Sequence, residues 1–175
     1  SFEASGVAGT ARTGERAAYL AVKAPNHWAA FGGAIEVEPF ARYKVTEWAK
    51  ARVTKGNFYA PYCYGWDSYE WAFCASAKAP VGDQWQQTEL TFVTPDKQMW
   101  VHPLGYIEAA DSEGWADDIV VEKIAQPEQV MAEIAAKANR SVDETRLLGR
   151  WLVLHNDLAG AAKLMDDYGI DGVYL

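Results

Sequence analysis

The residues best suited to chemistry in this sequence are aromatic. The chain carries 8 Trp, 9 Tyr and 6 Phe among 175 residues, and its tryptophan count is several times that of an ordinary soluble domain. Five aromatic residues crowd into one segment: Tyr62, Tyr64, Trp66, Tyr69 and Trp71. An aromatic ring offers a flat apolar face, and Trp and Tyr add a polar group at the ring edge. The composition therefore favours a binding function.

The same sequence offers little for catalysis. It has three histidines, but it contains neither a Gly-x-Ser-x-Gly nor a Gly-x-Gly-x-x-Gly motif. Hydrolysis of a glycosidic bond needs two carboxylates on either side of that bond. Asp117 and Asp118 are neighbours on one segment and cannot flank a sugar, and nothing in the sequence pairs Glu47 with Glu108. We therefore expect a binding module and not an enzyme.

Composition also excludes several classes of protein. At 19.4 kDa the chain can hold one domain, or one domain and a fragment of a second. Half of its residues are hydrophobic and 23% are charged, which is typical of a folded chain. A net charge of −8 without a basic block argues against nucleic acid and anionic membranes as partners. We expect a processed chain, because no signal peptide or 18-residue apolar run is present.

Two cysteines, Cys63 and Cys74, lie inside the aromatic segment. They can close a hairpin through a disulfide or remain as two buried thiols. We favour the disulfide, because the other features place the chain outside the cytoplasm. Without a nearby pair of histidines, the two cysteines do not form a structural zinc site.

Between residues 16 and 124 the hydrophobic pattern has the period of two that is typical of β-strands. The alternation is clearest over 35–37, 43–53, 90–92 and 119–121, and Gly, Pro and Asp interrupt it at intervals typical of a jelly roll. We therefore predict an all-β jelly-roll β-sandwich. One position breaks the pattern: Glu47 takes the apolar side of its strand and Trp48 the polar side. Either a β-bulge shifts the register there, or Trp48 faces outward.

After residue 124 the pattern becomes helical. Pro127, Val130, Met131 and Ile134 predict an amphipathic helix with Pro in its first turn. We then predict a buried strand at 151–154, a helix at 158–168 closed by Gly169, and a second strand at 170–175. These predictions divide the chain into a sandwich over 1–125 and a helix plus β-α-β extension over 126–175.

The extension has two interpretations. It is either the start of a truncated (β/α)₈ catalytic domain or an appendage packed on the sandwich. We expect its apolar faces to be completed by chain beyond this sequence, because the sandwich motifs are already complete by residue 124.

Several short segments resemble carbohydrate-binding modules of families 4, 9, 16 and 22. These segments are Phe2-Glu3, the turn 12–18, the strand 43–50, the segment 85–95 and Gly114-Trp115-Ala116-Asp117-Asp118-Ile119. They follow the order and spacing of those modules over residues 1–125. The resemblance implies a galactose-binding-like jelly roll that acts as the non-catalytic, secreted sugar-binding module of a polysaccharide-degrading enzyme. The parent polypeptide would be a glycoside hydrolase or polysaccharide lyase. The alternative is a structural spacer without sugar binding, packed against a glycoside hydrolase domain.

The resemblance also implies which residues bind sugar. Trp28 and Tyr106-Ile107-Glu108 take the places of cleft residues in family 22, and Phe92 that of an aromatic before a strand-ending Pro. With the aromatic segment added, the candidates are Trp28, Tyr62, Tyr64, Trp66, Trp71, Phe92, Tyr106 and Glu108, with Asn26, Gln86, Gln87 and His102 as polar partners. We expect Trp85 and Trp115 to lie in the core.

Related modules commonly hold a structural calcium ion, and the resemblance places its ligands at Glu3, Asp117 and Asp118. Carbonyl groups of the turn 12–14 would complete the six to eight oxygens that calcium prefers. Adjacent residues of a strand point to opposite faces, so we expect Asp117, which shares its side with Ile119, to be the main ligand. The alternative is a pair of solvated turn carboxylates.

Overall fold

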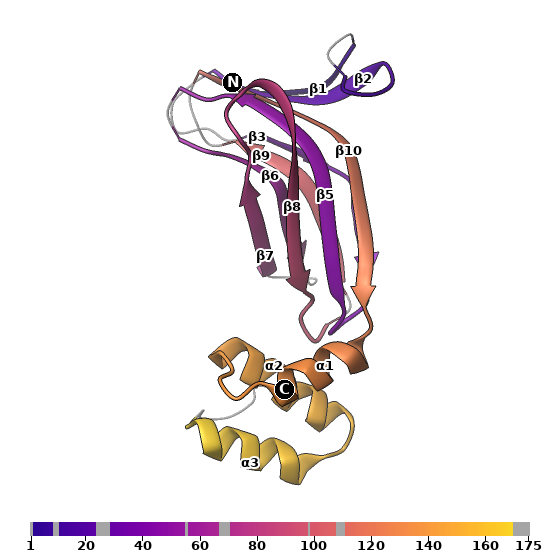
Figure 1. Cartoon of the computed structure of the whole chain (residues 1–175), viewed down its shortest axis with the longest axis vertical. Helices are drawn as coiled ribbons and strands as arrows, with labels where there is room; N and C mark the ends of the chain where they lie inside the picture. Colours follow the sequence, from indigo (N-terminus) through magenta and orange to yellow (C-terminus); the bar gives the residue numbers. More distant parts are fainter. Residues whose placement is uncertain are drawn as a thin grey trace.

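The computed structural model shows two antiparallel β-sheets followed by helices (Figure 1). It describes residues 2–8, 11–23, 29–54, 56–66, 71–97, 99–107 and 111–169. In sheet A the strand order is β1 (Phe2–Ala8), β2 (Arg16–Val22), β10 (Ser112–Ala125), β5 (Arg42–Arg52) and β8 (Gly82–Val93). In sheet B it is β3 (Ala29–Gly32), β9 (Met99–Ile107), β6 (Phe58–Trp66) and β7 (Trp71–Lys78), and β4 (Ile35–Val37) also pairs with β9. The predicted all-β jelly-roll β-sandwich is confirmed.

Strand β5 shows why the sequence forms this sandwich. Its odd-numbered residues from Tyr43 to Ala51 are buried between the sheets, and its even-numbered residues face outward. The pairing of β5 with β8 runs in register through Glu47 and Trp48, so no bulge in this pair interrupts the alternation. Glu47 therefore faces the core, and Trp48 faces outward with the Arg12 guanidinium 3.7 Å from its ring centroid.

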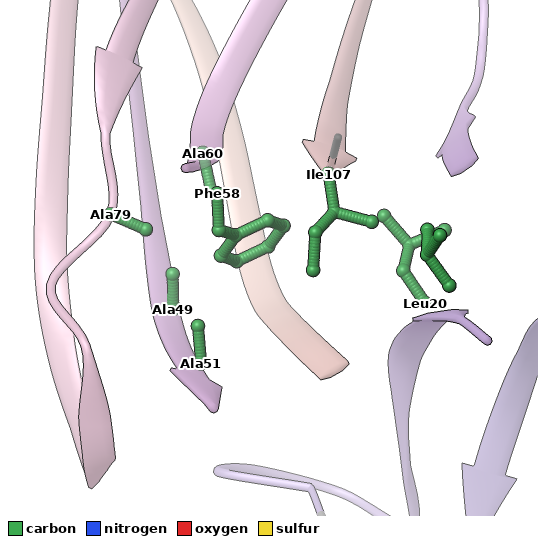
Figure 2. Packing of buried hydrophobic residues seen from close by; sticks show 8 residues of the cluster. Leu20, Ala49, Ala51, Phe58, Ala60, Ala79 and Ile107 are labelled. Carbon is green, nitrogen blue, oxygen red and sulfur yellow. The ribbon is translucent and has the colours of Figure 1, made fainter. Parts of the chain in front are cut away.

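The core joins large side chains of one sheet to small ones of the other. One cluster surrounds Phe58 of β6 and includes the small residues Ala49 and Ala51 of β5 together with Leu20 and Ile107 (Figure 2). Gly114 of β10 belongs to the same contact, because a Cβ at that position would lie 2.8 Å from the Phe58 ring. A second cluster contains Val37, Ala41, Tyr43, Val45, Cys63, Phe92 and Val101.

The predicted disulfide is wrong. Cys63 is buried, Cys74 is exposed, and both are free. In the pairing of β6 with β7, Cys63 lies opposite Ala75 and Cys74 lies opposite Tyr64. Neighbouring positions across this register face opposite sides of sheet B, which keeps the two sulfur atoms apart.

The extension contains three helices in its described part: α1 (Pro127–Ala136), α2 (Val142–Leu154) and α3 (Leu158–Tyr168). The predicted helices α1 and α3 are confirmed, and Gly169 closes α3 in the left-handed region at φ 60°. The predicted strand at 151–154 is wrong, because these residues end α2. A capping box starts that helix, in which Ser141 and Glu144 accept each other's backbone N–H groups. The second predicted strand, at 170–175, lies outside the described residues.

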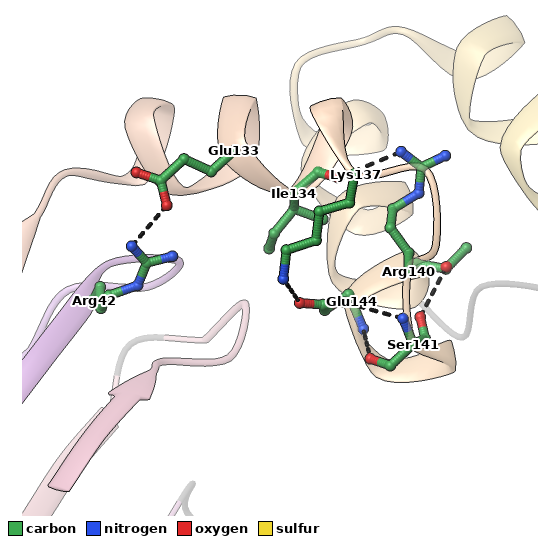
Figure 3. A network of polar contacts seen from close by, with 8 residues as sticks. Arg42, Glu133, Ile134, Lys137, Arg140, Ser141 and Glu144 are labelled. Carbon is green, nitrogen blue, oxygen red and sulfur yellow. Dashed lines mark hydrogen bonds and ion pairs between the residues drawn. The ribbon is translucent and has the colours of Figure 1, made fainter.

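The helices pack on the end of the sandwich. Val130, Met131 and Ile134 of α1 share a cluster with Phe40 and Ala125 of the sandwich, and Leu148, Leu164 and Met165 join it from α2 and α3. The Phe40 ring meets the Trp151 ring edge-on at 5.2 Å. Ion pairs Arg42–Glu133, shown in Figure 3, and Arg150–Asp96 close the contact at 2.7 Å each. The apolar stripe of α1, which was expected to be covered by chain beyond this sequence, is instead covered by the sandwich and by α2 and α3. None of them has the length and apolar character to span a membrane.

Candidate functional site

An irregularity in β6 gathers tyrosines on the outer face of sheet B. Residues Phe58, Ala60, Cys63 and Gly65 face the core. The pairing of β6 with both of its neighbours shifts between Tyr59 and Tyr62. Without that shift, two residues three positions apart would face opposite sides of the sheet. Because of the shift, Tyr59, Tyr62 and Tyr64 share the outer face.

Tyr106 of β9 completes this group. Its backbone pairs with Tyr59, and its ring stacks on the Tyr62 ring with centroids 4.7 Å apart and planes inclined by 22°. Tyr59 lies 6.2 Å from both of these rings, and Tyr64 lies 6.4 Å from Tyr62. All four side chains are half-buried. We call Tyr59, Tyr62, Tyr64 and Tyr106 the tyrosine face.

Trp100 shares the outer face of sheet B with these tyrosines. Trp100 of β9 has the parity of Tyr106, while Val101 and Ile107, which have the other parity, are buried, so Trp100 belongs to the outer face. Its side chain is 52% exposed. The backbone of Trp66 in β6 pairs with both Trp100 in β9 and Trp71 in β7. The sheet therefore places three tryptophan positions side by side.

The structure treats the other sugar-binding candidates differently. Trp28 and Glu108 lie outside the described residues, as do Asn26 and Tyr69. Phe92 is 6% exposed and stacks on Tyr43 in the core, because both residues point inward from paired positions of β8 and β5. Its predicted place in the sugar site is therefore corrected to a place in the core.

Two members of this aromatic surface, Tyr59 and Trp100, were not predicted. The sequence signal for Tyr59 is Pro61, because proline inside a strand pattern marks an edge or an irregularity. Gln86 and Gln87 are exposed on sheet A, the opposite side of the sandwich from the tyrosine face.

Trp85 and Trp115 are not in the core between the sheets. Trp115 is only 9% exposed, but its β10 neighbours Gly114 and Ala116 are the residues that face inward. Its ring lies on the outer face of sheet A beside Tyr19 and under Lys50 and Arg52. The Lys50 ammonium also lies 4.6 Å from the Trp85 ring centroid. The expected core placement is thus corrected. Lys50 shields both rings, and Tyr19 and Arg52 shield the ring of Trp115.

The predicted calcium ligands meet the predicted turn. Asp117 Oδ2 accepts hydrogen bonds from the backbone N–H groups of Arg12 at 2.8 Å and Thr13 at 3.2 Å. Asp118 accepts hydrogen bonds from the Arg12 guanidinium at 2.6 Å and from the Thr13 hydroxyl, and these two bonds lower its pKa. The carboxylates are thus held by donors of the protein itself.

The described side chains alone do not make a calcium site. Among them, no group of three or more His, Cys, Asp or Glu residues is arranged to hold a metal ion. Glu3 pairs through its backbone with Ala21, which pairs on its other side with Glu113, four residues before Asp117 on β10. The side chain of Glu3 lies outside the description, so its predicted role as a calcium ligand stays a prediction.

Glu47 lies behind the tyrosine face, inside the core. Its side chain is fully buried, and neither carboxylate oxygen has a hydrogen-bond partner in the described part of the chain. Burial raises the pKa of Glu47 from 4.5 to about 8. Burial, with the nearby Glu47 as the next cause, raises the pKa of Cys63 to about 12. Cys63 lies between Tyr62 and Tyr64 on β6. Glu47 therefore faces the inner side of the strand that carries these tyrosines.

Comparison with known proteins identifies the class of fold. No protein-family model and no curated protein matches the sequence. The solved structure titled "Family 16 Carbohydrate Binding Module-2" matches 70% of this chain and 86% of its own, with a TM-score of 0.55 and 18% identity. The CBM22-1 xylan-binding domain from Paenibacillus barcinonensis Xyn10C matches 71% of this chain and 83% of its own, with a TM-score of 0.52 and 9% identity.

A third match contains more than the binding module. The CBM22-1-GH10 modules of Clostridium thermocellum xylanase 10B, complexed with xylohexaose, match 71% of this chain and 25% of their own, with a TM-score of 0.52 and 12% identity. At such identities the matches establish the fold alone. The fold is the jelly roll found in carbohydrate-binding modules, so the resemblance inferred from the sequence is confirmed at that level.

Proposed function

We propose that this chain is a non-catalytic carbohydrate-binding module that holds glycan chains on the tyrosine face. The observation that carries the proposal is the group of four neighbouring tyrosines on the outer face of sheet B, with the exposed Trp100 on the same face of β9. Sugar rings present flat C–H surfaces that stack on aromatic rings, and their hydroxyl groups pair with phenol oxygens. Trp28 and Glu108 remain proposed members of this site.

The resemblance and the fold support a role beside a catalytic domain. We propose that the parent polypeptide is a secreted glycoside hydrolase or polysaccharide lyase, with polysaccharide as the partner of this module. One matching structure carries a GH10 module in the same chain as its CBM22-1 module and was solved with xylohexaose. The net charge of −8 agrees with a neutral glycan as ligand in preference to an anionic one.

Removing the central ring of the tyrosine face should weaken glycan binding. We expect Tyr62→Ala to lower affinity for a bound polysaccharide at least tenfold, about 1.4 kcal/mol, because its ring contacts those of Tyr59, Tyr64 and Tyr106. Affinity gel electrophoresis with xylan, β-glucan, mannan and galactan measures the effect. For the unmodified chain, a few stacked rings give dissociation constants from about micromolar to millimolar.

The matched control is Tyr168→Ala, which removes a half-buried tyrosine from α3 at the far end of the molecule. It should bind as the unmodified protein does. Thermal melting of each variant separates lost binding from lost folding. If the unmodified protein is retarded by none of the four polysaccharides, the proposal fails and the structural spacer takes its place.

We also propose that calcium binds at Asp117 of β10, with carbonyl groups of the turn 12–14 completing its ligands. A metal that binds only the folded chain stabilises it by mass action. We therefore expect a chelator to lower the melting temperature by about 4 °C or more, and calcium to restore it. In Asp117→Asn the chelator should have no further effect. An unchanged melting temperature of the unmodified protein in chelator would refute calcium binding.

A further inference from the structure

A pocket lies at one end of sheet A. It occurs where β2 and β5 end and β10 begins, and its volume is about 310 Å³. Glu113 of β10 sits at its centre, paired with Ala21 of β2 on one side and with Arg52 of β5 on the other. The polar lining residues are Lys23, Arg52, Thr54, Asp111, Ser112 and Glu113, above an apolar floor of Ala21 and Val22.

The charged groups of this pocket contact one another and their neighbours at the surface. Arg52 Nε donates to Asp83 Oδ1 at 2.6 Å, and its Nη1 lies 3.8 Å from Glu113 Oε2. The Tyr19 hydroxyl donates to the other oxygen of Glu113 at 2.7 Å. The Arg52 guanidinium lies 5.6 Å from the centroid of the Trp115 ring.

Thr54, on the other side of the pocket, is hydrogen-bonded to the start of β10. The Thr54 hydroxyl donates to the backbone carbonyl of Asp111 at 3.2 Å, and the Thr54 N–H donates to the Ser112 hydroxyl at 3.4 Å. The Asp111 carboxylate has no hydrogen-bond or ion-pair partner among the described residues. Asp111 lines the pocket, and its carboxylate keeps its acceptor positions open within the described part of the chain.

We propose that this pocket binds one neutral sugar residue and gives the chain a second glycan site. Among the described residues, the cations Lys23 and Arg52 lie beside the carboxylates of Asp111 and Glu113 and beside Asp83, which pairs with Arg52, so the lining does not favour an anionic ligand. It offers donors beside acceptors, the arrangement that pairs with adjacent sugar hydroxyl groups. The volume lies at the lower end of the range of small-ligand pockets. Because the pocket shares no residue with the tyrosine face, each proposal stands or fails by itself.

The experiment is a titration of the full chain with D-xylose, D-glucose, D-galactose and D-mannose, followed by ¹H–¹⁵N NMR. We expect at least one sugar to shift the amide signals of Arg52, Thr54 and Ser112 saturably, with a dissociation constant of about a millimolar or weaker. The same shifts should occur in Tyr62→Ala, which tests the pocket independently of the tyrosine face.

Asp111→Asn supplies the decisive variant. Asparagine tolerates the left-handed backbone of this position, where φ is 52°, so the variant should fold. Removing the charged acceptor should weaken sugar binding at least tenfold at these amides. The control Asp143→Asn makes the same charge change on the exposed start of α2 and should leave the shifts unchanged. Absence of saturable shifts up to about 50 mM of every sugar, or tighter binding of D-glucuronate than of D-glucose, overturns the proposal.

Discussion

Glu47→Gln is expected to stabilise the protein at neutral and alkaline pH and to flatten the dependence of its stability on pH. The carboxyl of Glu47 is fully buried, and no described residue hydrogen-bonds to it. Its pKa is about 8 in the folded chain, against 4.5 without burial. An ionised carboxylate in this position would lack both water and a partner, so the folded protein keeps Glu47 protonated.

The direction of the pH effect follows from these two pKa values. Below pH 4.5 the side chain is protonated in both the folded and the unfolded state, so no penalty arises. As the pH rises from 4.5 to about 8, the unfolded chain releases this proton and the folded chain does not. The free energy of unfolding then falls by up to about 1.4 kcal/mol per pH unit, or up to about 5 kcal/mol over the window. Above pH 8 the loss is complete and constant.

Urea unfolding at pH 4, 6, 7 and 8 measures this effect. The difference in unfolding free energy between Glu47→Gln and the unmodified protein should grow with pH and level off near pH 8. Glu122→Gln serves as the control, because Glu122 is an exposed glutamate on the neighbouring strand β10. A difference that stays constant with pH would show that Glu47 ionises in the folded protein as readily as in the unfolded one.

The position of Glu47 gives this effect a place in the fold. On β5 it lies between Val45 and Ala49, which belong to two separate core clusters. Across the sandwich it approaches Cys63 of β6, the strand that carries three of the four rings of the tyrosine face. Ionisation of Glu47 would therefore affect β6, the strand that carries most of the proposed sugar site.

The sequence predicted strand faces well where one rule decided them. The period of two placed Tyr43, Val45 and Glu47 on one side of their strand, and the burial of β5 follows that pattern without interruption. The pattern did not predict the shared face of Tyr59 and Tyr62, because a register shift between two sheet neighbours cannot be read from alternation in one strand. The aromatic site depends on that irregularity.

The apolar run 151–154 shows a hydrophobic pattern that fits both a strand and a helix. The run 151–154 is apolar at every position, and periodicity alone does not distinguish a buried strand from a helix in so short a run. The capping box at Ser141 and Glu144, ten residues before the run, starts the helix that contains it. For Trp115, size and apolarity indicated the core, whereas its position between inward-facing Gly114 and Ala116 puts it on the outer face of sheet A.

Gly114→Ala is expected to destabilise the fold by about 1–3 kcal/mol, because it overfills the tightest contact of the core. A Cβ at this position would lie 2.8 Å from Cε2 and Cζ of Phe58, whose ring is 1% exposed and enclosed by Leu20, Ile107 and the alanines of β5 (Figure 2). Thermal melting should show a decrease of several degrees. Gly33→Ala is the control, because a Cβ there meets nothing within 4 Å.

A smaller side chain at position 58 should restore part of the stability that Gly114→Ala loses. In Phe58→Leu with Gly114→Ala, the shorter side chain leaves space for the added methyl group, so the second substitution should cost less than it does in the unmodified chain. The double-mutant cycle measures this coupling, and two neighbouring residues in direct contact should give at least about 0.5 kcal/mol. Additive effects of the two substitutions would show that the strain of Gly114→Ala is absorbed by movement of β10 and not by the Phe58 ring.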